Sequence, residues 1–356
     1  MIKILHYLRN LGLGGTEKTC ELFFKYSSSD FDVVVAYEKT GDHTRLQQFR
    51  DAADECDGRL YEVDSHSTDS DLVALINKIK PDIVHVYRSG FEEYPEPGTH
   101  IDVPHFVETN VFGFVDRNPL IDRTLFMSRW LMDNTLRGFY HSRFDYVNNP
   151  VEEPYTQERL PGLAEEITWL GRCGRPDNGI YNAVNVEAAR LLRLQGHDVG
   201  FIVMAPPSNM IDDLKRHGIP YRAIKPTTDP VELSKFYNSV DIYAHARADG
   251  ETFGVNIAEA MMHGKPVVTH IATPSNPQMG VFQSQTELVD HGSTGIVVNN
   301  NAAEYSEALK VLLDPVMREG MGAAGFIKAV REYHVDACVR KLEKIYREIT
   351  NGKTEV

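Results

Sequence analysis

Short apolar runs of the kind that form buried strands recur along the whole chain, separated by amphipathic stretches of helical period. In the first half, strands are expected at residues 2–8, 32–37, 82–87, 103–109, 125–128 and 145–148, and helices at 16–26, 72–80 and 129–140. In the second half, strands are expected at 167–170, 200–205, 221–224, 241–246, 266–271 and 295–298, and helices at 183–195, 230–238, 302–313, 321–333 and 337–349. Strands that alternate with helices in this way are typical of doubly wound α/β folds with parallel sheets.

The alternation is interrupted by a polar stretch from Asn149-Pro150 to Pro161-Gly162. A chain of 356 residues is long for one hydrophobic core, and domain boundaries fall in polar linkers that contain proline and glycine. We therefore predict an α/β protein of two Rossmann-like domains, residues 1–150 and 151–334, followed by a last helix within residues 335–356.

The charge balance limits the partners that the protein can bind. Lysine and arginine number 37 against 51 aspartate and glutamate residues, a net charge of −14, whereas a nucleic-acid partner needs a basic face. The four cysteines are scattered and form no C-x-x-C pair, which argues against a zinc or redox motif. No apolar run approaches the length of a membrane span and no leader precedes the first strand, so we expect a cytoplasmic protein.

The stretch from Gly250 to Val268 carries the most chemistry. Glu251 and Glu259 are separated by seven residues, and the second glutamate is expected to open an apolar helix. Free backbone N–H groups at a helix start attract anions such as phosphate, whereas carboxylates accept hydrogen bonds from hydroxyl groups. Gly254 lies between the glutamates and permits close approach of a ligand to the backbone. This combination suits a nucleotide-sugar.

Two further loops lie between an expected strand and a helix. Arg172 and Arg175 follow the strand at 167–170, and the planar fork of an arginine suits a diphosphate, although an ordinary loop with surface arginines would look the same. Gly14 and Gly15 follow the first strand. Glu17 stands where a dinucleotide fingerprint needs its third glycine, so an NAD site is disfavoured, and a plain tight turn is the other interpretation.

In this order, the motifs resemble those of retaining glycosyltransferases with the GT-B fold, family 4 (glycosyl transferases group 1 type). The resemblance is strong over residues 169–298 and weaker over 1–150. Besides the Gly250–Val268 stretch, it is carried by Trp169–Arg172, Thr286–Val289, Gly292, Gly295–Val298 and Gly14–Glu17. It implies two Rossmann-like domains that face each other across a cleft, with the acceptor on the first and the nucleotide-sugar on the second. The last helix would cross back to the first domain.

The resemblance also implies roles for single residues. Arg172 would bind the diphosphate of the donor, Glu259 both ribose hydroxyls, and Glu251 the hydroxyls of the donor sugar. The family's phosphate-binding lysine falls on Asp177 or Asn178, which are not cationic, so Arg175 is a candidate replacement. Further donor contacts are expected from the glycine loop and from the backbone that precedes Glu259, namely Gly14, Gly15, Phe253, Gly254 and Val255.

Asn110 is the other departure from the family pattern. Members commonly place a histidine at the end of the corresponding strand, close to the reacting sugar. Asparagine can donate a hydrogen bond there, so Glu251 and Asn110 form the candidate catalytic pair. A strand-end turn residue is the alternative for Asn110.

The implied activity is transfer of a hexosyl unit, with retention, from a UDP- or GDP-sugar to a hydroxyl of a glycan, a lipid-linked glycan or a protein-linked glycan. A degenerate GT-B protein that binds without transfer remains an alternative, as does a nicotinamide oxidoreductase or sugar-nucleotide epimerase. Asp69-Ser70-Asp71 has a D-x-D spacing but precedes a helix, where such residues act as caps, so neither a metal ion nor another cofactor is expected.

Residues 112–144 mix aromatic side chains with arginines. A face for the acceptor or for peripheral membrane contact is one interpretation. A partly buried helix with solvated arginines is the other.

Overall fold

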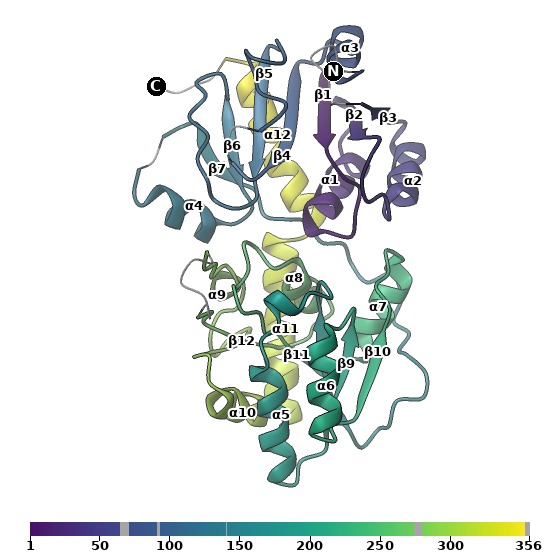
Figure 1. Cartoon of the computed structure of the whole chain (residues 1–356), viewed down its shortest axis with the longest axis vertical. Coiled ribbons are helices and arrows are strands. Elements are labelled where there is room, and N and C mark those ends of the chain that lie inside the picture. The colour runs from purple at the N-terminus through teal and green to yellow at the C-terminus, as the bar shows by residue number, and fades with distance from the viewer. Residues whose placement is uncertain (65–70, 91–92, 140, 274–279, 353–356) are drawn as a thin grey trace. The chain divides into compact units, whose positions relative to one another are not determined.

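In the computed structural model, the chain forms two units, and the structure describes residues 1–64, 71–90, 93–139, 141–273 and 280–352 (Figure 1). The first unit comprises Met1–Pro150 together with Val335–Val356, and the second comprises Val151–His334. The chain therefore passes from one unit to the other after Pro150 and returns after His334.

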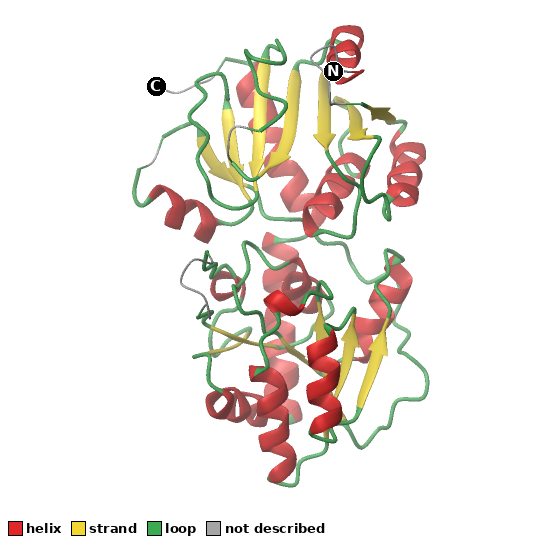
Figure 2. Ribbon diagram, in the orientation of Figure 1, coloured by secondary structure: helices red, strands yellow, loops and turns green. Residues whose placement is uncertain are grey.

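The first unit is built on a parallel sheet of order β3-β2-β1-β4-β5-β6-β7 (Figure 2). Alternate residues of its central strands point to opposite faces, so Ile4 and Val33 pack in one core while Leu5 and Val34 pack in the other. The strands are β1 (Ile2–Leu8), β2 (Phe31–Glu38), β3 (Arg59–Val63), β4 (Ile83–Arg88), β5 (His105–Asn110), β6 (Arg123–Phe126) and β7 (Phe144–Tyr146), and the helices before the linker are α1 (Gly15–Lys25), α2 (Leu46–Cys56), α3 (Asp71–Ile79) and α4 (Arg129–Leu136).

The last helix, α12 (Val335–Thr350), packs on the first unit. Its apolar side chains, among them Val339 and Leu342, join the core that α1 and α2 form on one face of the sheet. Tyr346 Oη lies 2.5 Å from His85 Nδ1, and Lys341 Nζ lies 3.3 Å from Asp145 Oδ1. Apolar packing and polar contacts thus both hold α12 in this unit.

The second unit has a parallel sheet of order β10-β9-β8-β11-β12-β13. One core contains strand residues such as Phe201, Val203 and Ile242 together with side chains of α5, α6 and α10. The strands are β8 (Thr168–Cys173), β9 (Val199–Met204), β10 (Tyr221–Ile224), β11 (Ile242–Ala244), β12 (Val267–His270) and β13 (Gly295–Val298). The helices are η1 (Asn178–Ile180, 3-10), α5 (Val184–Leu194), α6 (Ser208–Arg216), α7 (Pro230–Ser239), α8 (Val255–Met262), α9 (Gln285–Leu288), α10 (Ala302–Val311) and α11 (Pro315–Glu332).

Several helices begin or end at other residues than the sequence predicted. α8 begins at Val255 rather than Ala258, because Gly254 in the left-handed conformation ends the loop. α11 begins at Pro315 rather than Met321, because Asp314 caps it and accepts a hydrogen bond from the N–H of Val316. α4 ends at Leu136 instead of continuing to residue 140, which lies outside the described residues.

The chain also contains elements that the apolar pattern did not predict: α2, β3, α6 and α9. β3 is an edge strand with mostly half-exposed residues, and α2 buries little more than Phe49 and Ala52. Such elements carry a weak periodic signal. Of the D-x-D motif, Asp69 and Ser70 lie outside the described residues, and Asp71 is the first residue of α3.

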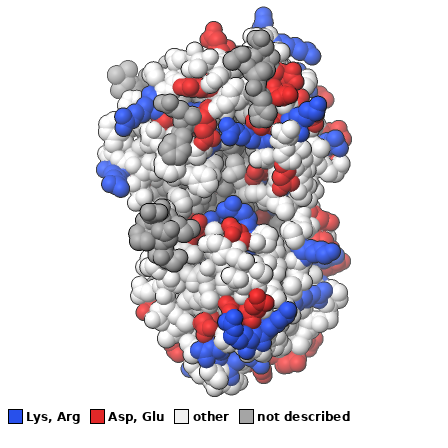
Figure 3. Space-filling view, in the orientation of Figure 1, with Lys and Arg blue, Asp and Glu red and all other residues white. Residues whose placement is uncertain are grey.

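Acidic and basic side chains are interspersed over the face drawn in Figure 3. A search of the described residues finds no helix with the length and apolar character needed to span a bilayer.

Candidate functional site

The strand order of the second sheet reverses between β8 and β11. From β8 the chain proceeds to β9 and β10 on one side, whereas β11, β12 and β13 lie on the other. In open parallel sheets, ligands bind in the crevice outside the carboxyl ends of the strands at such a switch point. Arg172 lies at the end of β8 and Arg175 lies in the loop that follows it, while the loop after β11 carries Glu251.

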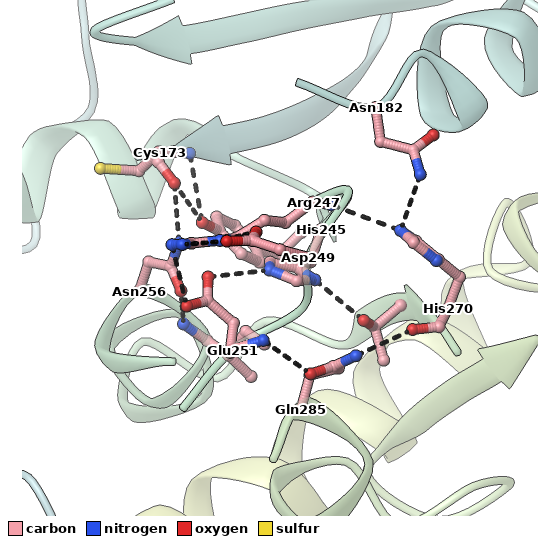
Figure 4. Close-up of polar contacts among 12 residues, drawn as sticks. Cys173, Asn182, His245, Arg247, Asp249, Glu251, Asn256, His270 and Gln285 are labelled. Atoms are coloured by element: carbon pink, nitrogen blue, oxygen red, sulfur yellow. Dashed lines mark hydrogen bonds and ion pairs between the residues drawn. The ribbon is translucent and has the colours of Figure 1, made fainter. Parts of the chain in front are cut away.

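Hydrogen bonds join the end of β8 to the first turn of α8. The side-chain amide of Asn256 donates to the carbonyl of Cys173 at 2.8 Å, and Tyr243 Oη lies 3.1 Å from both the nitrogen and the oxygen of Cys173 (Figure 4). An α-helix leaves the first N–H groups of its backbone without helical partners. The start of α8 is therefore tied to the end of β8, where Arg172 lies and from which the loop with Arg175 begins. This brings Arg172, Gly254 and Val255 into one region.

Gly254 gives α8 its starting direction. Its φ angle is +105°, and a Cβ at this position would lie 3.2 Å from the Cδ1 of Ile257. A side chain is strained in this conformation, so glycine is required for the loop to turn directly into the helix.

Arg172 is a buried cation. Its side chain lies at the end of β8, the residue is 4% exposed, and its Nη1 has no hydrogen-bond partner among the residues that the structure describes. Burial lowers the pKa of Arg172, and the nearby acidic groups, including Glu251, partly offset this effect. A buried guanidinium with an unsatisfied nitrogen is costly, and an anion bound at this nitrogen would remove the cost. Arg175 is exposed, and its charge lowers the pKa of Glu251.

Glu251 is held on both carboxylate oxygens. His245 Nε2 lies 3.1 Å from Oε1, and Arg247 Nη1 donates to Oε2 at 3.3 Å (Figure 4). Burial raises the pKa of Glu251, but the charge of Arg247 and the hydrogen bond from His245 outweigh it, and the pKa falls to about 2. Glu251 is therefore a carboxylate at every physiological pH.

Glu259 lies one turn into α8, on the same face as Val255, and not at the helix start as the sequence had indicated. The residue is 8% exposed, and its Oε2 accepts a hydrogen bond of 2.7 Å from the hydroxyl of Tyr237. Burial raises the pKa of Tyr237 well above its ordinary value, which keeps the hydroxyl protonated and able to donate. This bond holds one carboxylate oxygen of Glu259.

The side chain of Phe253 packs in the hydrophobic core. It is 1% exposed, and its ring packs edge-on against Tyr333 with the centroids 5.5 Å apart. Only its backbone can therefore contact a ligand. Among the described residues, no group of three or more histidine, cysteine, aspartate or glutamate side chains could hold a metal ion.

Three candidate residues lie in the first unit. Gly14 is the N-cap of α1 in an extended conformation, Gly15 is the first residue of the helix, and a Cβ on Gly14 would come within 2.2 Å of the carboxylate of Glu17. Asn110 is fully buried at the end of β5. Its Oδ1 accepts from the N–H of Gly113 at 2.7 Å, and its Nδ2 donates to the carbonyl of Phe114. The amide thus holds the loop after β5, and the roles expected for these residues at the donor stay predictions.

The structure also adds site residues that the sequence did not reveal. His245, Arg247 and Asp249 precede Glu251 on the same loop, and the signal that could have found them is this charged cluster at a strand end. Gln285 accepts from the N–H of Glu251 at 3.0 Å across 34 positions of sequence, which no local pattern indicates.

Comparisons with known proteins bear on the fold and on the second unit. Residues 164–315 match the sequence model of the family described as Glycosyl transferases group 1. A glycosyltransferase from Rickettsia africae ESF-5 has a similar structure, with a TM-score of 0.73 and 15% identity over 99% of both chains. HepE of Anabaena, solved in complex with UDP and glucose, is similar at a TM-score of 0.72 and 13% identity, over 98% of this chain and 100% of HepE.

A phosphatidyl-myo-inositol mannosyltransferase of Mycobacterium leprae (strain TN) is 23% identical over 207 residues, which is 55% of this chain and 50% of that relative. The match therefore spans half the length of the curated relative. The two parallel sheets and these structural matches define the GT-B fold, which confirms the expected α/β fold class. The residues that match the Glycosyl transferases group 1 model make up most of the second unit, Val151–His334.

Proposed function

We propose that the protein is a retaining glycosyltransferase that moves a hexosyl unit from a nucleoside-diphosphate sugar to an acceptor hydroxyl. The observation that supports this most strongly is the guanidinium of Arg172, buried at the switch point of the sheet with Nη1 unsatisfied among the described residues. A diphosphate suits it, because phosphate oxygens accept the parallel hydrogen bonds of a guanidinium and supply the missing charge.

Groups near Arg172 would bind the remaining parts of the donor. Glu259 would accept from the ribose hydroxyls and Glu251 from the hydroxyls of the sugar, since an ionised carboxylate accepts from several donors. The backbone of Phe253, Gly254 and Val255 would face the phosphates. UDP is the first nucleotide to test, because HepE was solved with UDP and with UDP-glucose, and GDP is the second.

The chemistry that we propose is electrostatic. Negative charge develops on the departing diphosphate, and Arg172, Arg175 and the first N–H groups of α8 would stabilise it. An oxygen of the diphosphate would take up the proton of the acceptor hydroxyl as the bond from the sugar to the diphosphate breaks, so that no protein side chain is needed as the general base. Because the cationic groups are side chains, we propose that the reaction requires no metal ion.

For the acceptor, we propose a glycan, free or linked to a lipid or protein. Phe112, Phe114 and Phe139 are 45%, 45% and 68% exposed on the first unit, and Arg117 and Arg137 are exposed beside them in sequence. These aromatic and basic side chains would contact the acceptor or a membrane surface, and flotation with anionic vesicles distinguishes the two. We place the reaction in the cytoplasm, in keeping with four free thiols.

A second candidate function is binding of a nucleotide-sugar without transfer. Two observations favour it: the place of the family's lysine falls on Asp177 or Asn178, which are exposed and not cationic, and the amide of Asn110 is engaged in its own loop. Such a protein would bind a nucleotide-sugar and release no diphosphate with any acceptor.

The test is a thermal-shift screen with UDP-, GDP- and ADP-sugars, followed by measurement of diphosphate release with the best donor. We expect one nucleotide class to raise the melting temperature, and the variants Arg172→Ala and Glu259→Ala to lose most turnover. Glu319→Ala, on the exposed surface of α11, is the matched control. Wild-type rates in both site variants would contradict the proposed function, and binding without release would favour the second candidate.

A further inference from the structure

The proposed function leaves three polar residues around Glu251 without a role: His245, Arg247 and Asp249 (Figure 4). The side chains of Arg247 and Asp249 are 19% and 13% exposed, and that of His245 is 4% exposed. Buried charged groups are kept where they pair with one another or act on a ligand. Their arrangement relative to Glu251 indicates which of these applies.

Arg247 is fixed by Asp249 in a fork. Its Nε lies 2.6 Å from Oδ1 and its Nη2 lies 3.0 Å from Oδ2, which leaves Nη1 to donate to Glu251 Oε2 at 3.3 Å. Bidentate pairing of this kind fixes the plane of the guanidinium, so the direction of the bond to Glu251 is fixed as well. Asp249 thereby acts on Glu251 through Arg247.

His245 is fixed from the opposite side. Its Nδ1 lies 2.9 Å from the hydroxyl of Thr269, and its Nε2 faces Oε1 of Glu251. A carboxylate can only accept, so Nε2 must carry a proton, and in the neutral ring Nδ1 accepts from Thr269. The backbone carbonyl of His245 accepts at 2.9 Å from the buried hydroxyl of Tyr305. The donor to Oε1 is therefore oriented as firmly as the donor to Oε2.

The backbone around Glu251 is also held. The N–H of Glu251 donates to Gln285 Oε1 at 3.0 Å, and the N–H of Arg247 donates to His270 Nε2 at 3.3 Å. Burial lowers the pKa of His270 to about 4, so this nitrogen remains an acceptor at neutral pH. These bonds fix the backbone of the loop at Arg247 and at Glu251.

We propose that Arg247 and His245 are positioning residues that orient the carboxylate of Glu251 toward the sugar of the donor. This inference rests on the proposed function and concerns only its sugar subsite. Each carboxylate oxygen can accept two hydrogen bonds. Arg247 and His245 each take one acceptor position on a different oxygen and thereby fix the direction of the others. They contribute to turnover and to recognition of the sugar, and not to binding of the nucleotide.

The alternative is that Arg247 contacts a phosphate of the donor directly. The following test distinguishes this role from positioning of Glu251. The variants are Arg247→Gln and His245→Gln, with Asp249→Asn to loosen Arg247 without touching Glu251. Arg331→Gln is the matched control, since Arg331 forms an exposed pair with Glu332 in the same unit. UDP binding is measured by calorimetry, and kcat and KM are measured with the UDP-sugar that the wild type turns over best.

We expect the Kd for UDP to stay within about twofold in all variants, whereas kcat falls about 100-fold in Arg247→Gln, the size of loss that a misplacement of about 1 Å produces. Asp249→Asn should show a smaller loss of kcat. This result would support the action of Asp249 on Glu251 through Arg247 even if Arg247→Gln folds poorly. The control should match the wild type.

The pH profile gives a readout that a purely structural role would not change. The charged and titratable groups that face Glu251 are Arg172 and Arg175 from the β8 side, Tyr243 and His245 from the end of β11, and Arg247 within its own loop. Without Arg247, burial dominates and the pKa of Glu251 rises. The acidic limb of kcat/KM should therefore move up by about one pH unit or more in Arg247→Gln.

Two results overturn the inference alone: unchanged kcat and pH profile in Arg247→Gln, or a tenfold loss of UDP affinity, which would make Arg247 a phosphate ligand. A wild-type protein that binds no nucleotide and turns over no sugar nucleotide would overturn the proposed function and this inference together.

Discussion

Replacing Arg172 by methionine should make the ligand-free protein more stable and the nucleotide-bound protein less so. Methionine keeps a similar length but removes the buried charge and the unsatisfied Nη1. Leaving such a donor without a partner costs about 1–3 kcal/mol, and much of this cost disappears in the variant. For a domain of 150–250 residues, each kcal/mol shifts the melting temperature by about 2–4 °C. The ligand-free variant should therefore melt a few degrees higher than the wild type.

Nucleotide binding should change in the opposite direction. A charge-assisted hydrogen bond contributes about 1.5–3 kcal/mol, and a loss of this size weakens affinity by about 10- to 100-fold or more. Thermal shift in buffer and calorimetry with UDP and GDP measure the two effects on the same samples. Arg331→Met, at an exposed position of α11, is the matched control. A ligand-free variant that melts lower while nucleotide affinity stays unchanged would refute the reasoning, because Arg172 would then be a structural cation.

Three further predictions follow from single contacts. Tyr237→Phe removes the hydrogen bond to Glu259 and should weaken UDP binding by about 0.5–1.5 kcal/mol. Binding of inorganic pyrophosphate, which has no ribose, should stay unchanged. Calorimetry with both ligands measures this, and equal losses for both would contradict the prediction. Gly254→Ala places a side chain at a φ of +105° and should destabilise the protein by about 1–3 kcal/mol in urea unfolding, whereas an unchanged midpoint would mean that the loop relaxes freely. Burial lowers the pKa of His6 to about 3 and that of His270 to about 4, whereas both have a pKa of about 6.5 in the unfolded chain. Below pH 6.5 the unfolded chain therefore binds more protons than the folded protein. The contribution of these histidines to the free energy of unfolding is full above pH 6.5 and falls as the pH drops toward 4. Each histidine adds a slope of up to about 1.4 kcal/mol per pH unit, and His6→Phe should flatten the dependence in urea unfolding between pH 7 and 5; an unchanged slope would show that His6 does not contribute.

Much of the fold could be predicted because buried parallel strands are continuous apolar runs. β1, β4 and β12 are of this kind, and each was expected within a few residues of its observed bounds. β3 and α2 were not expected, because a half-exposed edge strand and a helix with few buried residues look like polar loop. The start of α8 was placed too late, since the conformation of Gly254 that ends the loop is not visible in the sequence.

The candidate site could be predicted where chemistry and sequence position coincide. Arg172, Glu251 and Gly254 lie next to strand ends or helix starts, and the structure places them around one switch point. The partners of Glu251 could not be predicted in the same way. Gln285 reaches it from a distant helix, and the pairing of Arg247 with Asp249 depends on a loop conformation that no periodic pattern encodes.

The measurement that tests the central claim most directly is a crystal structure of the chain soaked with UDP and, separately, with GDP. The account predicts one nucleotide at the switch point of the second sheet, with a diphosphate oxygen about 2.7–3.2 Å from the guanidinium of Arg172 and the ribose hydroxyls at the carboxylate of Glu259. A nucleotide bound elsewhere, or a crevice that stays without nucleotide at saturating concentrations of both, would contradict it.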